Sequence, residues 1–252
     1  PLLADVEGQS TVKTGKPVKA IRYNMFGVRR QCVEVYCELA KVKPETLRKV
    51  ATPGMDDNQL KPDDFELEGH PSNDAAKITM KALYGARLVR YELLWPICSS
   101  ARLVTKWIRA CDKRLRRLMF YIHHTPDHSL ESFVGDDAQH CHPVLFSDAD
   151  FAGDMQTAKS TSGCYLAIVG PDTFAPVISS CKTDTCVSHS LTESGTVAAE
   201  QGVRTEGLQA LAFWELVTEL LGTNQPKVVE TQGAKPTALE LNPYSGRFGP
   251  GK

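Results

Sequence analysis

The chain has 252 residues, of which 42% are hydrophobic, and this is enough to bury a sizeable core in one or two domains. Its formal net charge of −1 excludes a strong overall attraction to nucleic acid, so any such attraction has to come from a local patch. No apolar run reaches the roughly 18 residues that a membrane span needs, which argues against a membrane protein. The eight cysteines form no Cys-x-x-Cys pair, so reduced thiols in a nuclear or cytoplasmic setting are expected.

The first 74 residues are predicted to form an N-terminal tail, a short helix and an acidic linker. Residues 1–20 are polar and lack periodicity. Between residues 29 and 41, apolar side chains recur at helical spacing, which indicates a short helix. Residues 51–74 are acidic and rich in Pro, Gly, Asn and Asp, a composition typical of a linker or an exposed, disordered loop.

Residues 75–142 are predicted to form a helical connection segment. An apolar stripe over residues 75–90 indicates one helix, which Pro96 ends or interrupts. A second helix is predicted at 99–123, where apolar residues recur every three or four positions. Its other face carries Lys106, Arg109, Lys113, Arg116 and Arg117, and Arg102 and Arg114 flank it. These seven cations, with Asp112 as the one acid among them, are called the basic face below.

The basic face has two interpretations. For an arbitrary protein, the ordinary one is a helix surface that is simply solvated. The other is a surface that follows the phosphates of a nucleic acid, because each Lys or Arg that contacts a phosphate adds affinity by releasing counterions.

Residues 143–225 are predicted to form a mixed α/β (α+β) domain. Short apolar runs at 143–146, 164–169 and 174–180 indicate three strands, and residues 185–189 extend the third or pair beside it. Short turns between consecutive strands favour an antiparallel meander. A long helix is predicted from Thr192, a suitable N-cap, to Leu221, although Gly202 and Gly207 weaken its middle. Residues 226–252 are expected to be a loose tail.

Several motifs stand in an order that resembles one family. SDADFAGD (147–154), KSTSGCYLAIVG (159–170), VSHSLTESGTVAA (187–199) and RTEGLQALAFWEL (204–216) are together similar to the ribonuclease H domain of copia-type retrotransposon Pol polyproteins. Residues 81–125 resemble the segment that connects the reverse transcriptase to that domain, with Arg90-Tyr91-Glu92-Leu93 where these polyproteins have an Arg-Pro-Asp-Leu-like turn. The resemblance implies a degenerate ribonuclease H-like core with an incomplete fourth strand.

The family cleaves the RNA strand of an RNA–DNA hybrid with Mg²⁺ held by carboxylates. The resemblance places its first metal-binding acid at Asp148, and Asp150 shares a face with Asp148 if the strand continues. The second acid belongs inside the long helix at Gly195, where this chain has no side chain, although the preceding family acid is kept as Glu193. The third acid is replaced by Thr223. Because a pair of Mg²⁺ ions needs several carboxylates, a catalytically impaired site is expected, with Mg²⁺ as cofactor only if it is active.

Three functions therefore stay open. The first is an active ribonuclease H with Asp148 as metal ligand, helped by Asp150 and Glu193. The second is an inactive descendant that binds RNA–DNA hybrid or duplex nucleic acid through the basic face and Lys159. The third is a relic or a recruited structural subunit that holds a protein partner by the open sheet edge left by the incomplete fourth strand.

Overall fold

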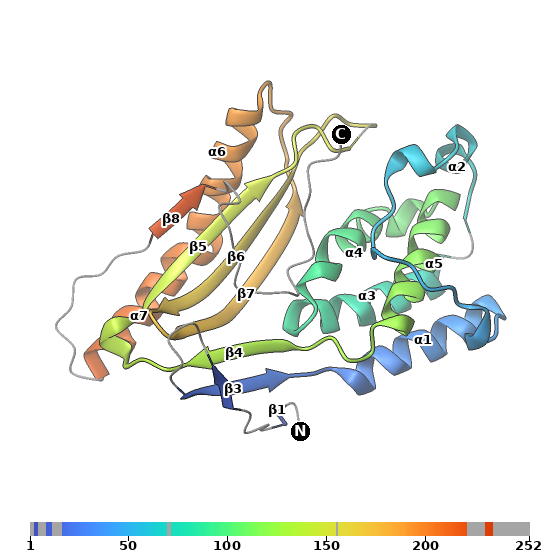
Figure 1. Cartoon of the computed structure of the whole chain (residues 1–252). Helices are drawn as coiled ribbons and strands as arrows, with labels where there is room; N and C mark the ends of the chain where they lie inside the picture. The colour runs from blue at the N-terminus through green and yellow to red at the C-terminus, as the bar shows by residue number, and fades with distance from the viewer. Residues whose placement is uncertain are drawn as a thin grey trace.

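The computed structural model describes residues 3–4, 9–11, 17–69, 72–154, 156–220 and 230–233 (Figure 1). The predicted mixed α/β class is confirmed. The strands are β1 Leu3–Ala4, β2 Gln9–Thr11, β3 Pro17–Tyr23, β4 Leu130–Val134, β5 His142–Ala149, β6 Thr161–Gly170, β7 Thr173–Thr183 and β8 Glu230–Gly233. The α-helices are α1 Phe26–Ala40, α2 Pro62–Glu66, α3 Ser72–Leu88, α4 Leu94–Ala101, α5 Arg109–His124, α6 Leu191–Gly202 and α7 Leu208–Leu220.

The described strands form one sheet in the order β1-β3-β4-β7-β6-β5-β8, with β2 paired to β3 beside this path. β5, β6 and β7 form the predicted antiparallel meander. β8 runs parallel to β5, opposite residues 144–147. A parallel neighbour needs a crossover connection, and the segment that holds α6 and α7 lies in the chain between β7 and β8.

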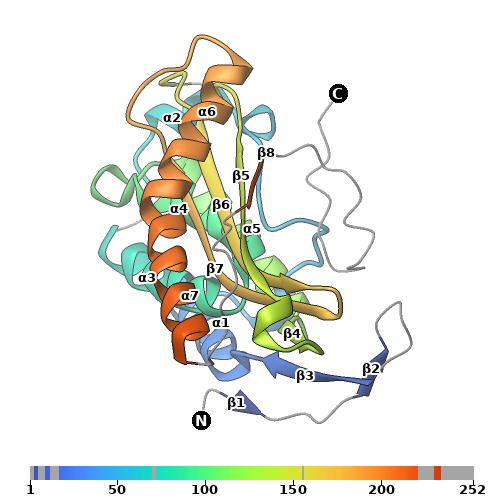
Figure 2. The same ribbon diagram turned by 90° about the vertical axis from the view of Figure 1, so that its left-hand side faces the viewer.

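The two faces of the meander are covered by different helices. α6 and α7 lie along one face (Figure 2), where Leu145, Cys164 and Leu166 form a small core with Ala210. Successive strand residues point to opposite faces, so Tyr165 lies on the other face. There its ring contacts Tyr91, with centroids 5.9 Å apart, beside the helical part made of α1, α3, α4 and α5. That helical part holds the larger apolar core, which includes Ile97, Cys111 and Met119.

The long helix is present but changes its winding in the middle. Residues Val203–Gly207 form a π-helical turn between α6 and α7. A Cβ at Gly202 would lie 2.7 Å from Cys164 Sγ, so glycine allows the helix to approach β6 closely at the place where the sequence predicts weakness. π-Turns of this kind insert an extra residue into a helix without ending it.

The second predicted helix is wrong in its first half. Residues 94–124 contain two helices, α4 and α5, separated by a 3₁₀ turn at Val104–Lys106 and by the extended residue Trp107. Pro96 lies in the first turn of α4, where its missing N–H breaks no intrahelical hydrogen bond. Pro96 therefore starts a helix rather than ending one. No helix among the described residues is long and apolar enough to span a membrane.

Segments expected to lie outside the core also take part in it. β3 pairs with β4, which had no strand prediction, and β4 joins the meander through the pair Phe133 and Phe174. The acidic segment 51–74 contains α2 and buries Leu60 and Asp64, so it is not a free linker. β8 lies within the expected tail 226–252 and adds a short fourth strand beside β5. Residues 185–189 do not extend β7, which ends at Thr183.

Candidate functional site

Asp148 stands near the end of β5, as the sequence predicts. Its side chain is exposed, and its Oδ1 accepts a 2.9 Å hydrogen bond from the N–H of Ala149. Leu145 and Ser147 belong to the face under α6, so strand alternation places Asp148 on the opposite face. This acid is available to solvent, but it does not point toward the long helix.

Asp150 does not join Asp148, because β5 ends at Ala149 and the chain turns away. The Asp150 carboxylate accepts a hydrogen bond from the Thr161 N–H, and a Cβ at Gly153 would overlap it. Burial raises the pKa of Asp150; the Thr161 N–H opposes this change and the nearby Asp184 charge adds to it. Asp150 therefore closes the loop between β5 and β6 rather than helping to bind a metal ion.

Glu193 is a helix cap. Its Oε2 accepts a 2.7 Å hydrogen bond from the His189 N–H, and its own N–H donates a 3.1 Å hydrogen bond to Ser190 Oγ. Ser190 rather than Thr192 is the N-cap, because Ser190 has the extended backbone that an N-cap requires and its side chain accepts from the Glu193 N–H. The Glu193 carboxylate reaches back to the N–H of His189, one residue before the N-cap. Glu193, the family acid that this chain retains, thus uses its carboxylate to cap the start of α6.

Gly195 is exposed on α6, and a Cβ placed on it would meet nothing within 4 Å. There is room for an acidic side chain at this position, but glycine supplies no carboxylate. Thr223 lies outside the described residues. Among the described acids that the resemblance selects, Asp148 is therefore the one whose carboxylate is exposed and does not close a loop or cap a helix. One such carboxylate does not fit a pair of Mg²⁺ ions, which needs several. Among the described residues, no group of three or more His, Cys, Asp or Glu side chains could hold a metal ion.

The basic face is largely engaged with the acidic segment 51–64. Asp64, with a side chain 3% exposed, pairs with Lys113 and with Arg109, whose Nε is 3.7 Å away. Arg114 pairs with Asp57, and Arg117 donates to the carbonyl and hydroxyl oxygens of Thr52. These contacts tie the segment to α5, so most of this face is not a free ridge.

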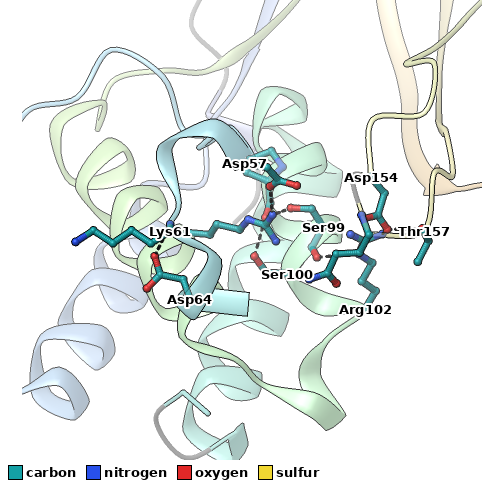
Figure 3. A network of polar contacts seen from close by, with 11 residues as sticks. Asp57, Lys61, Asp64, Ser99, Ser100, Arg102, Asp154 and Thr157 are labelled. Atoms are coloured by element: carbon teal, nitrogen blue, oxygen red, sulfur yellow. Dashed lines mark hydrogen bonds and ion pairs between the residues drawn. The ribbon is translucent and has the colours of Figure 1, made fainter. Parts of the chain in front are cut away.

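The remaining predicted cations have different surroundings. Arg102 donates a 2.6 Å hydrogen bond from Nη1 to Oδ2 of Asp154, in the loop between β5 and β6 (Figure 3). Arg116 is exposed and lies over the Phe120 ring, 5.3 Å from its centroid. Lys106 is exposed in the 3₁₀ turn before α5, and Lys159 is half-buried in the loop before β6.

Asp154 is a residue that sequence reasoning did not select. It accepts hydrogen bonds from Arg102, from Thr157 Oγ1 at 2.6 Å and from the Gln156 N–H at 3.1 Å. Burial by itself would raise the pKa of Asp154, but the hydrogen bonds from Thr157 and Arg102 outweigh it and the pKa is lowered. The ion pair with Arg102 fastens the end of α4 to the meander. The family motif contains this Asp, but its partner lies 52 residues earlier in the chain.

Buried Asp184 was also missed. It follows β7, accepts a 2.6 Å hydrogen bond from Ser162 Oγ, and donates its N–H to the Ser160 carbonyl. No sequence pattern marks it, because its partners come from β6 and the loop before it. Asp184 stabilises the same end of the meander that carries Asp150.

No protein-family model, curated protein or solved structure matches this chain.

Acid is expected to weaken the contacts of Asp64. The hydrogen bond from Lys113 lowers the pKa of Asp64 below its usual value of 3.8, and the 2.9 Å hydrogen bond from the Lys61 N–H lowers it further, against the effect of burial. A pKa that is lower in the folded state adds stability above the unfolded-state pKa, and this stability is lost as pH falls through the folded-state pKa. Between about pH 5 and pH 2, the thermal midpoint of the wild-type chain should fall more steeply than that of Asp64→Asn. Parallel curves from circular dichroism melts would contradict this expectation.

Proposed function

We propose that this chain is a retrotransposon-derived, ribonuclease H-like protein that does not hydrolyse RNA and that binds RNA–DNA hybrid or duplex nucleic acid. The strand arrangement supports the proposed descent. An antiparallel meander, a long helix and a short fourth strand beside the first follow one another in the order that the family resemblance implies. The motifs quoted above fall on the expected elements, with Asp148 near the end of β5.

The proposed loss of hydrolysis depends on which residues stand at the positions where the family has its metal-binding acids. Asp148 is kept and exposed, Glu193 caps a helix, and Gly195 has no side chain where the family has its second ligand. A hard divalent cation held by one carboxylate and water binds weakly. Removing several ligands of one site reduces the rate by orders of magnitude, and the losses do not add.

Nucleic-acid binding in this proposal depends on the cations that stay accessible. Lys106 and Arg116 are exposed, Arg109 is 56% exposed, and Lys159 is half-buried. Arg109 keeps its 3.7 Å pairing with Asp64, and closer contacts within the chain engage the other cations of the basic face, which are Arg102, Lys113, Arg114 and Arg117. About four cations therefore stay accessible, fewer than the sequence alone suggests. Each phosphate contact contributes about 0.9 to the slope of log K against log salt, and the slope should therefore be no steeper than about −4.

The test is a binding titration and a cleavage assay on one sample, with a labelled RNA–DNA hybrid as probe. We expect no Mg²⁺-dependent cleavage, and binding that weakens with salt and does not depend on sequence. Lys106→Ala with Arg116→Ala should flatten the salt slope by about 2, since two phosphate contacts are lost. Arg204→Ala, which removes an exposed cation paired with Glu200 on α6, is the matched control and should leave the slope unchanged.

Two results would overturn the proposal. Cleavage that requires Mg²⁺ and disappears in Asp148→Asn would restore the active enzyme. An absence of binding at low salt would remove the nucleic-acid function.

One surface favours a second candidate function, the binding of a protein partner. Four large apolar side chains of α7 are between 52% and 75% exposed: Leu208, Phe213, Leu216 and Leu220. The open edge of the sheet is a weaker argument than the sequence suggests, because β8 covers residues 144–147 of β5. Exposed apolar patches commonly mark interaction surfaces. This candidate takes precedence if the titration above finds no binding to the hybrid.

A further inference from the structure

A cavity of about 330 Å³ lies between α1 and the end of α5. This volume is within the range of roughly 300–1,000 Å³ that small-molecule sites have. Much of its wall is apolar and comes from the two helices and from prolines beyond their ends: Phe26, Val33, Pro44, Ile122 and Pro126. A wall of this kind favours a ligand with an apolar body, because such a ligand leaves water when it enters.

A buried cation lines the same cavity. Arg29 is 6% exposed, and its Nη1 donates hydrogen bonds of 3.4 Å to the Thr125 carbonyl and 2.6 Å to the His128 carbonyl. Its Nε is also buried and has no hydrogen-bond partner. Because both acceptors are neutral carbonyl groups, the hydrogen bonds of Arg29 supply no full negative charge to balance the guanidinium.

A second buried guanidinium lies beside the first. Arg90 is 1% exposed, donates a 3.0 Å hydrogen bond to the same Thr125 carbonyl, and pairs with Glu92. Burial lowers the pKa of Arg29 to about 10, and the charge of Arg90 adds to this change, whereas Glu92 and Asp127 oppose it. Arg29 therefore remains a cation at neutral pH, but the charges around it disfavour that form.

A buried cation without a matching anion is costly, because the protein interior stabilises a charge less than water does. The carboxyl end of α5, capped by Thr125, offsets part of this cost with a partial charge of about −0.5. An anion in the cavity would offset more of it, since opposite charges attract more strongly in a poorly solvated site than in water. The cavity therefore favours a negatively charged group beside Arg29.

The other titratable groups of the cavity do not take this role. Arg30 forms a 2.8 Å ion pair with Glu34, and both side chains are at least half exposed. Burial lowers the pKa of His123 below its usual value of 6.5; the charge of His124 adds to this and that of Glu45 opposes it, so His123 is neutral at neutral pH. The buried guanidinium is thus the charge that an anion in the cavity would meet.

We propose that this cavity binds a small monocarboxylate with an apolar body, such as a medium-chain fatty acid, with the carboxylate on Arg29 and the chain between α1 and α5. The contacts to Thr125 and His128 use Nη1, which leaves the Nε–Nη2 edge of the guanidinium. A guanidinium edge matches the two oxygens of a carboxylate. A free phosphate would use the same donors but would gain nothing from the apolar wall.

The position of the cavity links it to the sheet. β3 leads directly into α1, and Pro126 stands between α5 and β4, the strand that pairs with β3 (Figure 1). A ligand held by both helices would therefore stabilise the junction of the helical part with this edge of the sheet. Because the ligand binds the folded chain, its presence should raise the thermal midpoint as its concentration increases.

The experiment is a calorimetric titration of the folded, full-length wild-type chain with three probes. Octanoate has both the charge and the apolar chain, octanamide has the chain without the charge, and acetate has the charge with almost no chain. We expect one octanoate per chain, with octanamide and acetate at least about tenfold weaker, since each lacks one half of the recognition. This comparison needs no variant and so does not depend on how any variant folds.

Two variants place the binding in this cavity. Arg29→Met keeps an unbranched side chain but removes the charge, and it should lower the octanoate affinity at least about tenfold, to the level of octanamide. Arg48→Met, which removes an exposed arginine, is the matched control and should leave the affinity unchanged. Val33→Phe fills part of the cavity without touching the guanidinium, and it should weaken octanoate binding by a similar factor.

Three results would overturn the proposal. The first is an absence of octanoate binding at millimolar concentration. The second is equal binding of octanoate and octanamide, which would point to a non-specific apolar surface such as that of α7. The third is wild-type octanoate affinity in Val33→Phe, which would place the ligand elsewhere. If Arg29→Met does not fold, the wild-type comparison and Val33→Phe decide the matter.

Discussion

Replacing Arg90 with Ala should lower the free energy of unfolding by about 3–5 kcal/mol, because it removes the buried partner of several polar groups. The Arg90 side chain is 1% exposed and pairs with Glu92. Its Nη1 and Nη2 donate hydrogen bonds of 3.0 and 2.9 Å to the carbonyl and hydroxyl oxygens of Thr125. The guanidinium also lies over the Tyr121 ring, 5.7 Å from its centroid. One side chain thus fastens the turn after α3 to the end of α5.

Chemical denaturation followed by circular dichroism measures this effect. Arg48→Ala, which removes an exposed arginine, is the matched control and should change the free energy by less than about 0.5 kcal/mol. Arg90→Lys should recover only part of the loss, since an ammonium group cannot replace the planar set of donors that contacts Glu92 and both oxygens of Thr125. A loss below about 1 kcal/mol for Arg90→Ala would mean that this network does not hold the helices together.

Arg90 also illustrates what the sequence does and does not predict. The motif Arg90-Tyr91-Glu92-Leu93 is recognisable as a turn, and the structure has a 3₁₀ turn at Tyr91–Leu93. The partner Thr125 lies 35 residues further along, and no local pattern connects the two. β5, β6, β7 and the long helix were predictable because each has its own periodicity. β3 and β4 were not, because short strands acquire their identity from a partner more than 100 residues away in the chain.

The candidate site follows the same rule. The position of Asp148 near a strand end was predictable from the apolar run before it. The role of Asp150 was not, because its carboxylate accepts from the N–H of Thr161, 11 residues away. The role of Glu193 had a signal that was not used, because Ser190-x-x-Glu193 is a spacing typical of a helix N-terminus. The basic face and the acidic segment were each visible in the composition, but were interpreted separately. Opposite charge in two neighbouring segments was the available signal for the pairing of Asp64 with Lys113.

Substitutions at two glycines of α6 should change stability in opposite directions. A Cβ at Gly202 would lie 2.7 Å from Cys164 Sγ and 3.4 Å from Leu145 Cδ2, and both neighbours are buried. Overpacking of this kind costs about 1–3 kcal/mol, which exceeds the gain of about 1 kcal/mol in helix propensity from Gly to Ala when the clash cannot relax. Gly202→Ala should therefore destabilise the chain, with an increase in the distance of α6 from β6.

Gly195→Ala is the matched control, because a Cβ at that position meets nothing within 4 Å. It should stabilise the chain by about 0.5–1 kcal/mol, since alanine loses less backbone entropy than glycine on forming a helix. Adding Cys164→Ala to Gly202→Ala removes the sulfur with which the new methyl group collides, so the double variant should lose less free energy than the sum of the two single variants. Additive losses in urea denaturation would show that close packing of Gly202 on Cys164 does not determine the path of the helix. The opposite signs at positions 195 and 202 also separate two roles of glycine in this helix. At Gly202 the missing side chain lets the helix pack closely on β6, whereas at Gly195 there is room for a side chain, including an acidic one.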